Sequence, residues 1–72
     1  MDNTKYDRRH GGAYDRGSAD AYYRRPYDPH YYVGDTGSSE RVEMADMTAE
    51  EIVAYSVGYR EQEESGEFKR WD

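Results

Sequence analysis

The chain has 72 residues, a formal net charge of −6 and no cysteine, which limits it to one small domain without disulfide bonds or thiolate metal sites. Charged residues make up 36% of the sequence and leucine is absent, so tyrosines must supply much of any core. No apolar run approaches the roughly 20 residues of a membrane span, and no signal-peptide pattern opens the chain, so we expect a cytoplasmic protein.

The first element that the sequence predicts is a helix over about residues 13–24. Residues 1–12 before it are polar and lack a hydrophobic period, which predicts a flexible arm. Ala13, Gly17 and Ala21 then recur every four residues and share one face of a helix. Because a mid-helix glycine costs about 1 kcal/mol relative to alanine, this small-residue stripe indicates close approach of a second helix, with a break in the helix at Gly17 as the alternative.

An aromatic connection follows the first helix. Pro26 disfavours helical geometry in the preceding residue, which ends the helix. Residues 26–32 contain two prolines and three tyrosines and predict an extended segment. Residues 34–46 are rich in Gly, Ser, Asp and Glu, so we expect a solvated loop there.

The second helix has the clearest start signal in the chain and is predicted over about residues 49–63. Thr48 followed by Glu51 matches a capping box. Met47 and Ile52 occupy the two positions of a hydrophobic staple. These four side chains all favour a helix that begins directly after Thr48.

A second small-residue stripe, Ala54 and Gly58, lies on this helix, and Gly66 is suited to end it in a left-handed turn. We therefore predict an all-α fold, in which residues 13–64 form a two-helix hairpin and residues 65–72 form an aromatic and basic tail. Tyrosines beside the stripes are expected to fill the core, namely Tyr14, Tyr22, Tyr55 and Tyr59.

Catalytic chemistry finds little support in the sequence. His10 and His30 do not stand in a metal-ligand spacing, and no Gly-rich phosphate loop or nucleophile elbow is present. Five spaced aspartates indicate solvated turns and helix surfaces rather than a metal cluster. We expect a protein that is not an enzyme and holds no cofactor or metal.

The chain holds more tyrosines and arginines than a small core needs, and these types dominate binding hot spots. The candidate partner-binding residues are Tyr6, Arg8, Arg9, Arg16, Tyr22, Tyr23, Arg24, Arg25 and Tyr27. Ion pairs within the chain and cover for the helix pair are the alternative roles. A second, acidic candidate patch consists of Glu61, Glu63 and Glu64, for which a solvated helix face is the alternative.

The distribution of charge bears on the class of partner. Residues 1–34 hold six Lys or Arg against five Asp or Glu, and residues 35–72 hold four against eleven. An acidic chain lacks the positive charge from which nucleic-acid binding draws its affinity. We therefore expect a monomer with no strong direct DNA binding, whose partner is a protein with a basic patch or groove.

Two stretches carry a resemblance to ribosome modulation factors. Residues 13–31, AYDRGSADAYYRRPYDPHY, and residues 54–59, AYSVGY, are similar to the Ala/Gly/aromatic pattern that those proteins repeat across two helices joined by a Pro-Tyr connection. The resemblance covers about half of the chain and implies ribosome binding. The acidic charge departs from the family, whose members are basic.

The whole chain resembles another family in its length, its acidity and its Tyr/Arg-rich first half. It is similar to the small transcription regulators of lytic Xanthomonas phages. That resemblance implies a regulator in the cytoplasm of a bacterial host that binds the β and β′ subunits of RNA polymerase, interferes with σ-factor engagement at initiation and promotes anti-termination. It is our leading hypothesis. The alternatives are a ribosome-binding modulator and an acidic DNA mimic that inhibits a host nuclease.

Overall fold

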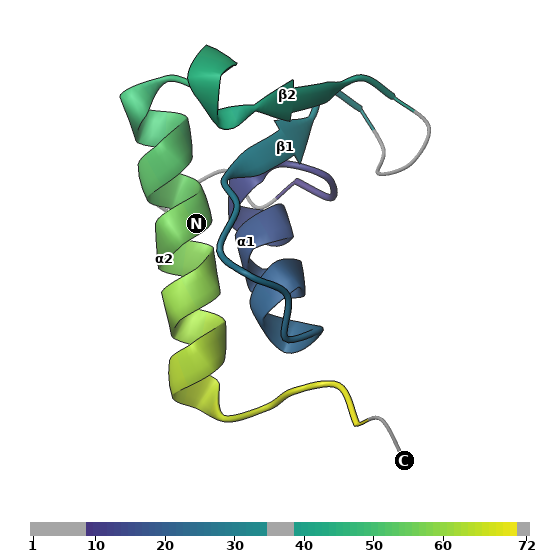
Figure 1. Ribbon diagram of the computed structural model, residues 1–72, viewed down its shortest axis with the longest axis vertical. Coiled ribbons are helices and arrows are strands. Elements are labelled where there is room, and N and C mark those ends of the chain that lie inside the picture. The colour runs from purple at the N-terminus through teal and green to yellow at the C-terminus, as the bar shows by residue number, and fades with distance from the viewer. Residues whose placement is uncertain (1–8, 35–38, 71–72) are drawn as a thin grey trace, which may run out of the picture.

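The computed structural model describes residues 9–34 and 39–70. In chain order the elements are helix α1 (Ala13–Tyr22), strand β1 (His30–Tyr32), strand β2 (Arg41–Glu43), the short 3-10 helix η1 (Met44–Asp46) and helix α2 (Ala49–Ser65) (Figure 1). The chain is therefore mostly helical, as predicted, but it is not all-α. Most of the predicted N-terminal arm and the last two residues of the tail lie outside the described residues.

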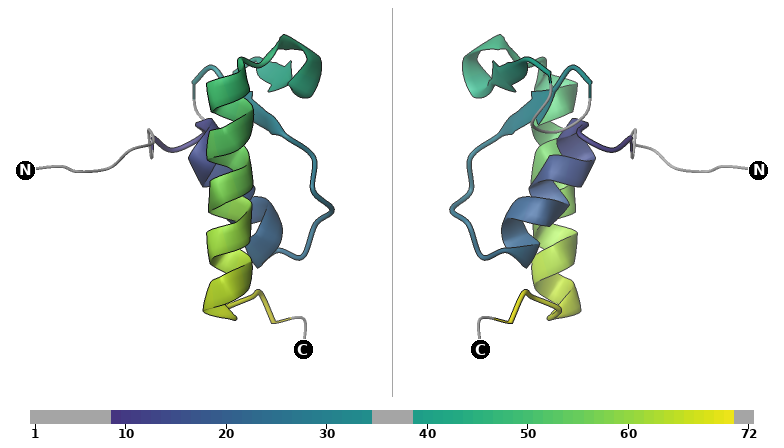
Figure 2. Two further views of the ribbon diagram at one scale, coloured as in Figure 1. Left: turned by 90° about the vertical axis from the view of Figure 1, so that its left-hand side faces the viewer. Right: turned by 90° about the vertical axis from the view of Figure 1, so that its right-hand side faces the viewer.

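The two helices lie side by side and run in the same direction, from the end of the molecule that carries the sheet to the opposite end (Figures 1 and 2). The predicted hairpin, in which consecutive helices are antiparallel, is therefore wrong. Residues 23–32 return the chain along the helices to the sheet, and α2 begins near the end where α1 began (Figure 1). A parallel pair needs such a long return, whereas a hairpin needs only a short turn.

The small-residue stripes form the seam between the helices, as the sequence predicted. A Cβ atom at Gly17 would lie under 3.0 Å from the backbone carbonyl of Tyr55, and one at Gly58 under 3.0 Å from the carbonyl of Tyr14. Only glycine leaves room for the two backbones at these positions. The two glycines thus set the distance between the helices.

A two-stranded antiparallel sheet covers one end of the helix pair (Figure 1). Its register places His30 opposite Glu43, Tyr31 opposite Val42 and Tyr32 opposite Arg41. The extended conformation predicted for residues 26–32 is present in β1, but β2 and η1 lie in the segment that was predicted to be a solvated loop.

The ends of α2 confirm the sequence signals. The Thr48 hydroxyl accepts a hydrogen bond from the Glu51 amide at 3.1 Å, and the Thr48 amide donates to Glu51 Oε1 at 2.8 Å. This reciprocal pair is the predicted capping box. Gly66 ends the helix with a φ of 74°, the left-handed conformation expected of it.

The core is small and lies between the helices and the sheet. Its buried apolar residues are Ala13, Tyr14, Ala21, Met47, Ala54 and Tyr55. Tyr59, which was expected in the core, packs against it and is partly buried. Tyr22 was also expected there but is 37% exposed, because it stands at the last turn of α1, where no sheet covers the helices. No helix in the described part of the chain is long and apolar enough to cross a membrane.

Candidate functional site

The end of α1 has an unusual residue in its terminating turn. Tyr23 caps the helix, the Arg24 amide donates to the Ala21 carbonyl at 3.0 Å, and the Arg25 amide donates to the Asp20 carbonyl at 2.7 Å. These two bonds form a Schellman motif, whose left-handed position is usually taken by glycine. Here that position is Arg24, with a φ of 61°. A residue with a Cβ atom is disfavoured in this conformation.

The arginines of this turn are stacked on aromatic rings. The Arg24 guanidinium lies over the Phe68 ring, 5.2 Å from its centroid, and the Arg25 guanidinium lies 4.9 Å from the centroid of Tyr23. The rings of Tyr22 and Tyr23 meet edge to face at 5.2 Å. Such cation–π contacts hold a guanidinium in place and leave its N–H edges accessible.

The segment after α2 folds back onto the same place. The Lys69 amide donates to the Tyr22 carbonyl at 2.7 Å, which brings Phe68 and Arg70 beside the end of α1. We call this surface the basic-aromatic end, and it consists of Tyr22, Tyr23, Arg24, Arg25, Phe68, Lys69 and Arg70. The sequence analysis did not include its last three members among the site residues, because nothing local to residues 66–70 indicates what they contact.

Two shallow hollows flank the stack of Arg24 on Phe68. One measures about 460 Å³ and includes Tyr22, Glu67 and Arg70 in its wall; the other measures about 340 Å³ and includes Arg25, Tyr59 and Glu63. Both hollows therefore combine aromatic rings with charges of both signs. Because the helices are parallel, their two C-termini also meet at this end, where cations are favoured by the helix dipoles.

A second cluster of polar residues lies inside the fold. Asp20 is only 4% exposed, His30 2% and Tyr55 0%. The Tyr55 hydroxyl donates to Asp20 Oδ2 at 2.5 Å, and Arg16 and Arg25 lie 3.3 and 3.4 Å from Asp20 Oδ1. These contacts join α1 to α2 and satisfy the buried carboxylate.

His30 joins β1 to this cluster. Its Nε2 atom accepts from Arg16 Nε at 3.2 Å, which leaves Nδ1 as the donor to the Asp28 carbonyl at 2.8 Å. The His30 ring is therefore a structural link between α1 and the sheet. The sequence analysis did not predict this role, because the partners of His30 come from separate segments.

The tyrosines near this cluster are held in the neutral form. Burial, together with the hydrogen bond to Asp20, raises the pKa of Tyr55 above its usual range. Burial, followed by the nearby charges of Glu63 and Asp20, also raises the pKa of Tyr59. A raised pKa makes a phenol a weaker proton donor, so these rings serve the structure. No group of three or more His, Cys, Asp or Glu among the described residues is arranged to hold a metal ion.

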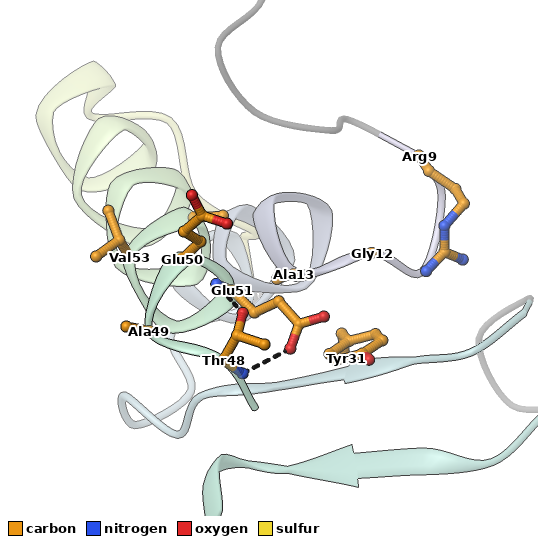
Figure 3. Close-up of a pocket in the computed structure, with 10 residues that line it drawn as sticks. Arg9, Gly12, Ala13, Tyr31, Thr48, Ala49, Glu50, Glu51 and Val53 are labelled. Carbon is orange, nitrogen blue, oxygen red and sulfur yellow. Dashed lines mark hydrogen bonds between the residues drawn. The ribbon is translucent and has the colours of Figure 1, made fainter. Parts of the chain in front are cut away.

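A third hollow lies at the opposite end, between the starts of the two helices and β1, and measures about 730 Å³ (Figure 3). Ala13, Ala49 and Val53 supply much of its apolar wall. Figure 3 shows the Glu51 carboxylate turned back to the Thr48 amide, and burial and Glu51 raise the pKa of Tyr31. Thr48 and Glu51 are engaged in the helix cap, and Arg9 in the carbonyls of Tyr32 and Gly34.

The structure divides the predicted arginines between two roles. Tyr6 and Arg8 lie outside the described residues. Arg9 donates to the carbonyls of Tyr32 at 2.9 Å and Gly34 at 3.2 Å, so it ties the start of the chain to β1. The Arg16 side chain is 11% exposed and bound to Asp20, which leaves little of it for a partner. Four of the predicted residues, Tyr22, Tyr23, Arg24 and Arg25, meet in the basic-aromatic end.

The remaining predicted residues are Tyr27, which contacts α2, and the three glutamates of the acidic patch, which stand on α2. Tyr27 is 51% exposed, but its hydroxyl shares a hydrogen bond with Ser56 and its ring meets the rings of Tyr55 and Tyr59 edge to face. The three glutamates of the acidic patch are exposed near the C-terminal end of α2. Glu61 accepts a hydrogen bond from the Tyr14 hydroxyl, and Glu63 lines the smaller hollow.

Comparisons of the chain with protein-family models, with curated proteins and with solved structures found no match.

Proposed function

We propose that the chain is a phage-encoded regulatory protein that binds the RNA polymerase of a bacterial host. It would interfere with σ-factor engagement at initiation and promote anti-termination by occupying a surface of the β and β′ subunits. The observation that supports a binding function is the basic-aromatic end, where arginines and tyrosines lie together at the surface and are not buried in the core. The choice of polymerase rests on the resemblance in length, acidity and Tyr/Arg content.

The composition of the basic-aromatic end suits a protein interface. Tyrosine and arginine are enriched among residues that dominate binding energy, because each combines a large contact area with directed hydrogen bonds. Tyr22 and Tyr23 are each 37% exposed, and Arg24 and Arg25 are exposed. Their stacking contacts already restrict the side-chain rotamers in the free protein. Binding therefore costs less conformational entropy, which favours affinity.

The opposite end of the molecule is acidic. Glu40, Glu43, Asp46 and Glu50 are exposed around β2, η1 and the start of α2, and we call this set the acidic end. The molecule measures 34 Å along its longest axis, whereas charges are screened over about 8 Å at physiological salt. The two ends therefore act as separate charged surfaces, and the acidic end suits a basic groove on the same large partner.

Binding to the ribosome is the second candidate function. The residues that carry the resemblance to ribosome modulation factors include Gly17 and Gly58, and these glycines form the seam between α1 and α2. The arrangement of two helices with a tyrosine-containing connection is thus compatible with that family. The chain as a whole has a net charge of −6, but the arginines and the lysine of the basic-aromatic end place positive charges together at this surface.

An affinity pull-down from bacterial lysate tests both candidates. The tagged protein is compared with the double variant Arg24→Ala, Arg25→Ala, and Arg60→Ala serves as the control because Arg60 is exposed on α2 and is not a member of the basic-aromatic end. We expect the β and β′ subunits with the wild type and the control, and a clear loss with the double variant. Recovery of ribosomal proteins and 16S RNA without polymerase would favour the second candidate, and recovery of neither would overturn both.

A further inference from the structure

We propose that the basic-aromatic end binds an acidic peptide segment of its protein partner, with a partner carboxylate held by Arg24 and Arg25 and a neighbouring aromatic side chain seated in one of the two hollows. This inference rests on the proposed function only in assuming that the partner is a protein. It adds the chemistry that the site recognises, and it does not depend on which protein supplies the segment.

The first argument comes from the backbone of Arg24. Its φ of 61° is the left-handed conformation, which glycine adopts without steric cost. Glycine would form both hydrogen bonds of the same turn, so the turn does not account for the arginine. A side chain kept at a sterically unfavourable position points to a role for that side chain.

The second argument comes from the geometry of the two guanidiniums. Each lies over an aromatic ring, at 5.2 Å from the centroid of Phe68 and 4.9 Å from that of Tyr23. A guanidinium held by one face offers its N–H edge, which pairs with two oxygens of a carboxylate at once. Arg25 lies 3.4 Å from a carboxylate oxygen of Asp20, so part of its N–H edge is already paired and Arg24 offers the freer edge to a partner.

The third argument distinguishes a carboxylate from a nucleic-acid backbone. Glu63 and Glu67 line the same hollows as Arg24, and their charges repel a continuous row of phosphates. A peptide carries separated carboxylates and offers N–H groups and apolar side chains between them. The rings of Tyr22, Tyr59 and Phe68 in the hollows suit an aromatic neighbour of the partner's carboxylate.

A binding measurement with two polymers separates these chemistries. The probes are a fluorescently labelled random copolymer of glutamate and tyrosine and a labelled polyuridylate of similar length, and fluorescence anisotropy is recorded at about 0.15 M salt, where the acidic end is screened. We expect tighter binding to the copolymer than to polyuridylate. Replacing the copolymer by polyglutamate should weaken binding, because the aromatic contact is lost.

Variants at Arg24 then locate the site. We expect Arg24→Gly to weaken binding of the copolymer about tenfold or more, while circular dichroism reports an unchanged helical fold. Arg24→Lys should also weaken it, because an ammonium group lacks the planar pair of donors. Arg60→Gln, which removes the same charge from the middle of α2, should leave the affinity unchanged.

The outcomes separate this inference from the proposed function. Tighter binding to polyuridylate, or unchanged affinity in Arg24→Gly, would overturn the inference even if the lysate experiment recovers polymerase through the same residues. Arg24-dependent binding of the copolymer would support it even if polymerase is not recovered, because the site would then serve another protein partner.

Discussion

The helix seam, taken together with the buried Asp20 cluster beside it, and the basic-aromatic end contain the same kinds of residue but have different roles. Each contains arginine and tyrosine, and they are joined at Asp20. In the seam Arg16 is 11% exposed and Tyr55 is 0% exposed, and their polar atoms are bound within the chain. At the end, Arg24 is exposed and lies over a ring. The role of an arginine here is set by its neighbours, and residue type alone does not reveal it.

The two regions should also differ in energy. A hydrogen bond or charge pair that is shielded from water is costly to break, because the remaining partner is left unsatisfied. A stack or ion pair at the surface competes with water and contributes little to stability. Substitutions in the seam should therefore cost stability, and substitutions at the basic-aromatic end should cost binding. Four predictions test this contrast, from the largest expected effect to the smallest.

The largest effect is expected for Gly17→Ala. The added methyl group would lie under 3.0 Å from the Tyr55 backbone, where no flexible side chain can move aside. We expect a loss of about 3 kcal/mol or more in the free energy of unfolding, which is a large part of the stability of so small a domain. Urea denaturation followed by circular dichroism measures it.

Gly66→Ala is the matched control for Gly17→Ala. Nothing lies within 4 Å of the position where its Cβ would stand, so only its left-handed φ of 74° opposes the change. We expect a cost of about 1 kcal/mol. Equal losses in the two variants would mean that the glycines do not set the distance between the helices.

The second prediction concerns the buried carboxylate. Asp20→Asn keeps the shape of the side chain but removes the charge that Arg16, Arg25 and the Tyr55 hydroxyl share. We expect a loss of about 2 kcal/mol in the free energy of unfolding. Asp28→Asn provides the comparison, because Asp28 pairs with Arg41 at the surface and should change stability by less than about 1 kcal/mol. A larger loss at Asp28 would contradict the contrast between the two regions.

The sequence predicted the local features of the fold well. The capping box at Thr48, the left-handed turn at Gly66 and the close approach at Gly17 each depend on a few neighbouring residues whose types are nearly diagnostic. The sheet was missed because each strand has three residues, too few to show a period of two. The direction of α2 was also missed, because it depends on the path of the connection, as residues 23–32 show, and not on the helices themselves.

The candidate site could be predicted only in part, for a related reason. Tyr22 to Arg25 are adjacent in the sequence and were identified as a group. Phe68 and its neighbours join them through the backbone hydrogen bond from the Lys69 amide to the Tyr22 carbonyl. A contact between backbone atoms cannot be predicted from residue types. Conversely, Arg16 has a tyrosine two residues before it, as Arg24 has, but the return of β1 places His30 against it. Contacts between distant segments decide both cases.

The third prediction is a loss of stability at alkaline pH. Because burial and Asp20 raise the pKa of Tyr55 in the folded state, its contribution to stability is complete below the unfolded value of about 10 and is lost as the pH rises above it. The free energy of unfolding should fall there by about 1.4 kcal/mol per pH unit from this one group. Unfolding by urea between pH 8 and 11, approximately, measures the slope, and Tyr55→Phe should make it shallower. An unchanged slope in that variant would mean that another group causes the loss.

The smallest effect, and the only one expected to raise stability, belongs to Arg24→Gly. Glycine relieves the left-handed conformation by about 1 kcal/mol, but it loses the exposed stack on Phe68 and adds freedom to the unfolded chain. We expect a net gain of about 0.5 kcal/mol in the free energy of unfolding, measured by urea denaturation beside Arg24→Asn, whose side chain tolerates the same turn. A clear loss of stability would show that the stack of Arg24 on Phe68 holds the tail in place, so that Arg24 belongs with Arg16 as a structural residue. A gain in stability combined with weaker binding would show that the chain accepts a less stable turn in order to present this arginine to a partner.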